Sequence, residues 1–65
     1  MNKFRKLEKI RIKYNYSCND IASFLGVSRT FYWQIENKKR RLYYIMAIQI
    51  ANIFETKPDD LFYEE

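Results

Sequence analysis

The stretch SCNDIASFLGVSRTFYWQIEN, residues 17–37, predicts two short helices joined by a tight turn. Ser17 is placed to cap the first helix, and Asp20 stands three residues later, as in a capping box. Gly26 supplies the positive φ that ends a helix at low steric cost. Ser28 can accept hydrogen bonds from the first N–H groups of the next helix. We therefore expect a capped helix, a glycine turn and a second capped helix.

Residues 29–37, the second of these helices, sort into two faces on a helical wheel. Tyr32 and Ile35 lie on one side, which suits a hydrophobic core. The other side gathers side chains of the kinds that contact base edges in DNA: Arg29, Thr30, Trp33 and Gln34. The competing interpretation is an ordinary polar face that carries an exposed aromatic ring. Two capped helices across a glycine turn, with a polar face on the second, indicate a helix-turn-helix.

Four basic residues follow this helix directly: Lys38, Lys39, Arg40 and Arg41. Such a run is often only solvated, but here it abuts the polar face and could grip a phosphate backbone. Residues 1–54 hold eleven basic and three acidic residues, whereas residues 55–65 hold one basic and five acidic residues. A basic body with an acidic end favours a polyanionic partner over an indifferent surface.

One cysteine, one glycine and no histidine in 65 residues exclude several classes of function. A disulfide within the chain, zinc sites with paired Cys or His ligands, and Ser–His or Cys–His nucleophiles all need residues that are lacking. A glycine-rich phosphate loop is excluded in the same way. We therefore expect no metal, no cofactor and no enzymatic activity. Without an apolar run of membrane-spanning length or a signal-peptide core, a cytoplasmic protein is expected.

Cys18 lies in the first turn of its helix, where the positive end of the helix dipole can favour a thiolate. Two interpretations stay open for this residue. It is either a redox-sensing thiol or a small, inert, half-buried one.

The first and last helices are expected to flank this motif. Residues 3–14 carry an apolar stripe at helical spacing: Phe4, Leu7, Ile10 and Tyr14. Pro58 suits the first turn of a short fifth helix, in which Leu61 and Phe62 can cover the core.

The fourth helix, expected over residues 43–54, is apolar almost all round. Six of its residues share a broad face that should join the core: Tyr43, Tyr44, Ala47, Ile50, Ala51 and Phe54. Ile45 and Ile53 then fall on the far side. A helix of so small a protein cannot bury every side in its own core, so part of this surface is expected to meet a second copy or another protein. The alternative is that the helix boundaries differ from those assumed.

The whole chain resembles the lambda-type phage repressor and Cro helix-turn-helix family, also called XRE-like regulators. The residues that carry the resemblance are Ile10-Arg11, Ser17, Ile21-Ala22, Leu25-Gly26-Val27-Ser28, Ile35-Glu36-Asn37, Ile50-Ala51 and Asp59-Asp60-Leu61-Phe62. The resemblance implies a compact all-α fold of five helices in a single domain over residues 1–65, with the third helix in the major groove.

The resemblance also implies roles for individual residues. Arg29, Thr30 and Gln34 fall at base-reading positions, with Trp33 beside them. Phosphate contacts are implied for Ser17, Cys18, Asn37, Lys38, Lys39, Arg40 and Arg41. Arg11 and Glu36 match a pair that forms a salt bridge between the first and third helices in relatives. The chain departs from the family pattern where Cys18 replaces the usual Gln and Lys38 replaces the usual Gly.

These observations predict a sequence-specific DNA-binding transcriptional regulator, a Cro-like repressor that binds double-stranded DNA as a homodimer. The expected dimer or partner surface comprises Ile45, Ile53, Leu61, Phe62 and Tyr63. No ligand-sensing domain is expected, so control is expected through abundance, dimerisation or a regulatory protein partner. The alternative is a protein-interaction module, antitoxin-like or regulator-binding, that uses the same fold. Architectural DNA binding is a third reading.

Overall fold

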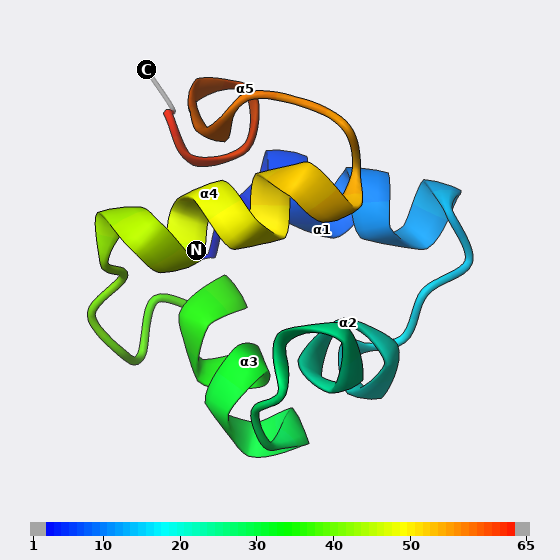
Figure 1. The fold of residues 1–65 in the computed structure, drawn as a ribbon, viewed down its shortest axis with the longest axis vertical. Helices are drawn as coiled ribbons and strands as arrows, with labels where there is room; N and C mark the ends of the chain where they lie inside the picture. Colours follow the sequence, from blue (N-terminus) through cyan, green and yellow to red (C-terminus); the bar gives the residue numbers. More distant parts are fainter. Residues whose placement is uncertain (1–2, 64–65) are drawn as a thin grey trace.

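The computed structural model describes residues 3–63, which form five helices and no strand. In chain order the helices are α1 (Arg5–Lys13), α2 (Cys18–Leu25), α3 (Arg29–Glu36), α4 (Tyr44–Ile53) and α5 (Pro58–Phe62) (Figure 1). The expected all-α, five-helix fold is confirmed. Within these residues no helix is long and apolar enough to cross a membrane.

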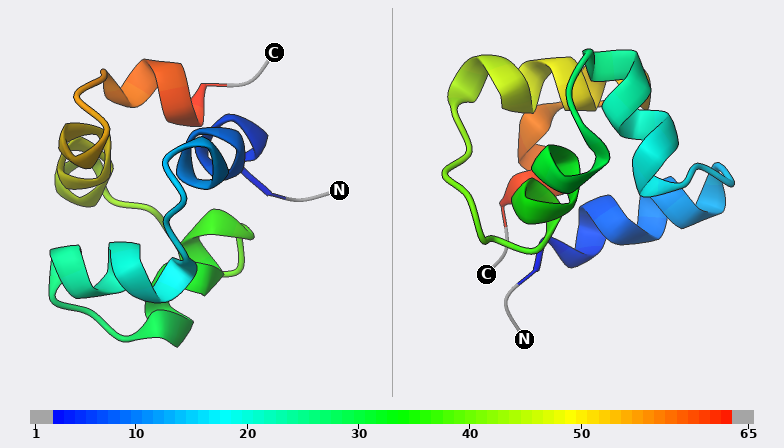
Figure 2. Two further views of the ribbon diagram at one scale, coloured as in Figure 1. Left: turned by 90° about the vertical axis from the view of Figure 1, so that its right-hand side faces the viewer. Right: turned by 90° about the horizontal axis from the view of Figure 1, so that it is seen from below.

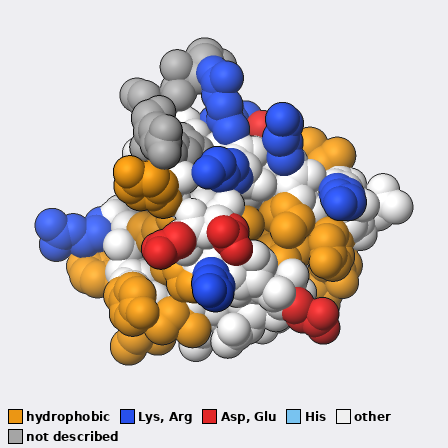
Figure 3. Space-filling view, turned by 90° about the horizontal axis from the view of Figure 1, so that it is seen from above, with side chains coloured by type: hydrophobic (Ala, Val, Ile, Leu, Met, Phe, Trp, Pro, Cys, Tyr) orange, Lys and Arg blue, Asp and Glu red, His pale blue; other side chains and the backbone are white. Residues whose placement is uncertain are grey.

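The helices are stacked so that α2 and α3 lie together on one side of the molecule and α5 lies on the opposite side, with α1 and α4 between them (Figures 1 and 2). α2 contacts both α3 and α4, while α5 contacts both α1 and α4. Seen from the α5 side, hydrophobic side chains form several patches between isolated basic and acidic groups (Figure 3). The third helix is therefore presented at the end of the molecule remote from these patches.

The turn between α2 and α3 forms as the sequence predicts. The Ser17 hydroxyl accepts a hydrogen bond from the Asp20 backbone N–H at 3.1 Å, and the Asp20 carboxylate accepts one from the Ser17 N–H at 2.8 Å. Gly26 ends α2 at φ 74°, and the Ser28 hydroxyl accepts from the Phe31 N–H at 3.1 Å. These contacts satisfy orphan N–H groups at the start of both helices.

Among residues 3–63, three residues other than glycine also adopt positive φ: Asn15 at 61°, Lys38 at 57° and Glu55 at 55°. Each follows one of the helices α1, α3 and α4 within two residues of its end. For an L-residue this left-handed conformation costs about 1–2 kcal/mol. The turn after α3 thus forms with Lys38 in place of the usual glycine, at the expense of backbone strain.

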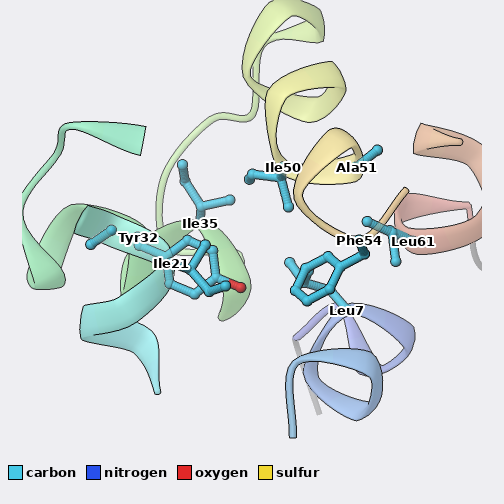
Figure 4. Close-up of a cluster of buried hydrophobic side chains, with 9 residues drawn as sticks. Leu7, Ile21, Tyr32, Ile35, Ile50, Ala51, Phe54 and Leu61 are labelled. Atoms are coloured by element: carbon cyan, nitrogen blue, oxygen red, sulfur yellow. The ribbon is translucent and has the colours of Figure 1, made fainter. Parts of the chain in front are cut away.

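The core lies where the five helices meet, and every helix contributes to it (Figure 4). Phe54, the residue directly after α4, also belongs to it. They are Leu7, Ile21, Ala22, Tyr32, Ile35, Ile50, Ala51, Phe54 and Leu61. Tyr32 and Ile35 are both fully buried, so the predicted core side of α3 is confirmed.

The prediction that Tyr43 and Tyr44 join the core is wrong, since their side chains are 65% and 74% exposed. Tyr43 is the N-cap of α4, with extended backbone angles of φ −92° and ψ 152°. It therefore does not share the rotation of the helix, and α4 begins at Tyr44, one residue later than expected. The other four residues of the predicted face, Ala47, Ile50, Ala51 and Phe54, are buried.

Candidate nucleic-acid interface

The four predicted base-reading residues all lie on α3, on the side away from the buried Tyr32 and Ile35. Their side chains are exposed at Arg29, Thr30 and Trp33 and half-buried at Gln34. The indole of Trp33 is 44% exposed although a ring of this size normally contributes to a core. The helix therefore presents two hydrogen-bonding side chains, a cation and an aromatic ring to solvent.

A buried salt bridge holds the inner side of α3. Arg11 donates from Nε to Oε1 of Glu36 at 2.8 Å and from Nη2 to Oε2 at 3.0 Å, a bidentate pairing of guanidinium and carboxylate. Glu36 is 2% exposed. Arg11 also donates from Nη1 to the Tyr16 carbonyl at 2.9 Å, just before α2. The structure thus contains the pair that the family resemblance implies, and it joins α1, α3 and the turn between α1 and α2.

Tyr32 is a further member of this network that the sequence reasoning missed. Its hydroxyl donates to Oε1 of Glu36 at 2.9 Å, from one turn earlier on the same helix. The sequence did contain a signal for this contact, because Tyr32 and Glu36 are four residues apart and therefore neighbours on one helix face.

The network determines the protonation states of Arg11 and Tyr32. The hydrogen bond to Glu36 raises the pKa of Arg11 above its ordinary value, despite the opposing effect of burial. Burial raises the pKa of Tyr32, and the neighbouring Glu36 charge raises it further. Arg11 therefore stays cationic and Tyr32 stays neutral, so the carboxylate of Glu36 is paired inside the protein and is turned away from any polyanion on the exposed face.

We call the face of α3 that carries the predicted base-reading residues the reading side. Arg40 lies closer to this side than its place in the sequence suggests. Its guanidinium carbon is 4.4 Å from the centroid of the Phe31 ring, which is the geometry of a cation–π contact. Its Nε donates to Oε1 of Gln34 at 3.0 Å. The side chain is therefore folded back along α3 rather than directed away from it. No periodic pattern could have shown this, because Arg40 follows the helix.

The remaining cations of the predicted phosphate set line the segment that follows α3. Lys38, Lys39 and Arg41 are all exposed. The Lys38 ammonium lies 4.7 Å from the centroid of the Phe4 ring, and the Arg41 guanidinium carbon lies 5.8 Å from that of Tyr43. The segment forms a run of positive charge beside α3 that could meet phosphates.

Two of the other predicted phosphate residues, Asn37 and Ser17, already have partners in the chain. Asn37 donates from its side-chain amide to the Trp33 carbonyl at 2.9 Å. The oxygen of the Ser17 hydroxyl is the helix cap described above, and its proton can still be donated. Cys18 is half-buried at the start of α2.

Cys18 does not have the lowered pKa that its place at a helix start suggested. Burial raises the pKa of its thiol, and the negative charge of Glu36 raises it further. These effects exceed the opposing influence of Arg11 and Arg29. The thiol is therefore protonated at neutral pH, which favours the inert interpretation over a reactive thiolate.

The predicted partner surface is only partly exposed. Leu61 is 2% exposed and belongs to the core, so its assignment to that surface is wrong. Phe62 is half-buried and packs edge-on against Phe4, with ring centroids 5.0 Å apart, and Ile53 is half-buried against the core. Ile45 and Tyr63 are exposed.

A shallow groove of about 390 Å³ opens between the start of α4 and α5. It is lined by Leu42, Tyr43, Tyr44, Ala47, Pro58, Asp59, Phe62 and Tyr63. This aromatic groove uses the tyrosines that the sequence placed in the core, and it lies at the α4–α5 end of the molecule rather than at α3.

Comparison with known families now identifies the class. A family model described as a helix-turn-helix domain matches residues 5–64, so the chain belongs to that family. The match is of the XRE type and is consistent with the lambda- and Cro-like resemblance. No curated protein and no solved structure gives a match. Membership indicates a DNA-binding regulator with DNA as its partner.

Proposed function

We propose that this protein is a sequence-specific transcriptional regulator, a small Cro-like repressor that places α3 in the major groove. The observation that supports this most is the division of α3 into two sides. Glu36 is held inside by hydrogen bonds from Arg11 and Tyr32. On the other side Arg29 and Trp33 are exposed and Gln34 is half-buried. A recognition helix needs such a rigid inner side, because base contacts depend on fixed side-chain positions.

The charge distribution supports the same proposal. The basic segment Lys38–Arg41 lies directly after α3, where it can contact the phosphates that flank the groove. The carboxylate of Glu36, which would be repelled by phosphate, is buried and paired. The acidic residue of α3 therefore does not oppose the attraction of the helix to DNA.

We further propose that the protein binds as a homodimer. A single domain of this size offers a small DNA interface, and two copies on half-sites about 34 Å apart would double it. Tyr44 and Ile45 at the start of α4 and Tyr63 after α5 are exposed. The aromatic groove between α4 and α5 is where we place the contact between copies.

The test is binding of the purified protein to the DNA upstream of its own gene over a salt series. We expect the logarithm of the affinity to fall linearly with the logarithm of salt concentration, with strong preference for a palindromic site. Arg29→Ala and Gln34→Ala should each relax specificity by about 1–3 kcal/mol, whereas Lys39→Ala should weaken binding to all sequences about equally. If the Arg29 and Gln34 variants discriminate like the wild type, the reading side is assigned wrongly.

A second candidate function is a protein-interaction module, and the aromatic groove is the observation that favours it. Exposed tyrosines beside an apolar groove are typical of surfaces that bind other proteins. Co-purification of a different protein at equal stoichiometry, with only weak and unspecific DNA binding, would favour this function. Discrimination between operator and random DNA would exclude it as the main role.

A further inference from the structure

The contact between Arg40 and Gln34 bears on which base the protein selects. A free glutamine side chain reads adenine with both ends of its amide, because Oε1 accepts from the adenine amino group while Nε2 donates to N7. In this protein Oε1 of Gln34 accepts a hydrogen bond of 3.0 Å from Nε of Arg40. One of the two lone pairs of the acceptor needed for adenine is therefore already occupied, and the oxygen is turned toward Arg40.

The Phe31 ring holds Arg40 in this position. The guanidinium lies 4.4 Å from the ring centroid, and Phe31 is itself half-buried against the core. A planar guanidinium stacks on such a ring and loses less freedom per hydrogen bond than a lysine ammonium would. Phe31, Arg40 and Gln34 thus form one unit, which we call the donor triad.

Within the donor triad, Arg40 and Gln34 present mainly donors to a base, because the Gln34 oxygen is turned to Arg40. When the planar Gln34 amide turns its oxygen to Arg40, its NH₂ group points away from Arg40. The guanidinium retains four further N–H donors beside it. Guanine presents two acceptors in the major groove, O6 and N7, whereas adenine presents one acceptor and one donor. The nearby positive charge also repels the adenine amino hydrogens.

We propose that Arg40 is a specificity-determining residue that makes Gln34 select guanine instead of adenine. This inference rests on the proposed function, since it takes α3 to be the reading helix. It replaces the phosphate role expected for Arg40 with a positioning role toward a base.

The test is selection of binding sites from a randomised DNA duplex by the wild-type protein and four variants. Gln34→Ala identifies the base pair that Gln34 reads, as the position where preference is lost. Arg40→Lys keeps the charge but removes the stacked fork, so the ratio of guanine to adenine at that position should fall by about 10-fold. Lys39→Ala, an exposed cation of the same segment, should lower affinity without changing that ratio.

Circular dichroism checks that each variant keeps its helices, which is expected because Arg40 and Lys39 are exposed. Phe31→Leu should shift the ratio in the same direction as Arg40→Lys. The inference is overturned if the wild type selects adenine at that position, if Gln34→Ala alters no position, or if Arg40→Lys keeps the wild-type ratio. A wild type that selects no motif would instead overturn the proposed function itself.

Discussion

Tyr32 and Arg11 donate to the same buried oxygen, Oε1 of Glu36, at 2.9 and 2.8 Å. Together with the second Arg11 bond to Oε2, this gives the carboxylate three hydrogen bonds from α1 and α3. No buried side-chain nitrogen or oxygen among residues 3–63 lacks a partner. A charge buried in an apolar core is tolerable only when it is satisfied in this way, so the position of α3 depends on a polar network as well as on apolar packing.

Removing one partner of this network should destabilise the fold strongly. Glu36→Ala leaves Arg11 with an uncompensated charge, and we expect the free energy of unfolding to fall by about 3–5 kcal/mol. Urea denaturation followed by circular dichroism measures it. The matched control is Glu8→Ala, which breaks the half-exposed 2.9 Å pair with Lys3 and should cost less than about 1 kcal/mol. Equal losses in the two variants would contradict the role given to the buried pair.

The stability of the protein should fall in alkali because of Tyr32. Its pKa is raised in the folded state, mainly by burial, whereas in the unfolded chain a tyrosine loses its proton near pH 10. The stabilisation is therefore fully present below about pH 10 and is lost above it, by at most about 1.4 kcal/mol per pH unit. The Tyr32→Phe variant has no such proton. The difference in unfolding free energy between the wild type and this variant should therefore become smaller between about pH 9 and 11. Parallel pH curves for the two proteins would show that Tyr32 does not titrate on unfolding.

Backbone strain at the helix ends can be tested in both directions. At Gly26, φ is 74° and an added Cβ would meet no atom within 4 Å, so Gly26→Ala adds only conformational strain. We expect it to cost about 1 kcal/mol, and Glu55→Gly, which relieves strain at φ 55°, to gain a similar amount. In thermal unfolding each change corresponds to about 4–8 °C for a domain of this size. Shifts of the same sign would refute this explanation.

Cys18 should react slowly with electrophiles in the folded protein. Because burial raises the pKa of its thiol, the reactive thiolate is scarce at neutral pH. Iodoacetamide at about pH 7.5 should modify Cys18 several-fold more slowly than in urea-unfolded protein. Mass spectrometry of timed samples measures both rates. Faster reaction in the folded state would restore the redox-sensing interpretation.

The proposed contact between copies is tested by a charge in the aromatic groove. Tyr44 is exposed, so Tyr44→Asp should leave the fold intact and shift sedimentation toward the monomer. Ile12→Asp introduces the same charge at an exposed apolar site near the end of α1 and should leave the association unchanged. A dimer that survives Tyr44→Asp would have its interface elsewhere.

Local signals in the sequence were sufficient for the helix-turn-helix. Capping at Ser17 and Ser28 and the left-handed turn at Gly26 depend on neighbouring residues only, and all three are present. The core side of α3 followed from helical periodicity, because Tyr32 and Ile35 both lie within the helix, three residues apart.

Several errors arose at helix ends and in short segments, where periodicity is a poor guide. Tyr43 lies outside α4. The five residues of α5 are too few to define an apolar side, so Leu61 was assigned to the partner surface as well as to the core. The contact between Arg40 and Gln34 crosses an irregular segment, and its geometry depends on where Phe31 packs. Such a contact can be found only in three dimensions.

The Arg11 side chain has a consequence for protein engineering. Residues 17–37 contain both helices of the motif, yet the group that neutralises Glu36 comes from α1, 25 residues away in the sequence. A transplant of residues 17–37 into another scaffold would carry a buried acid without its counterion. The recognition motif therefore cannot be transferred alone, and a working chimera must include α1.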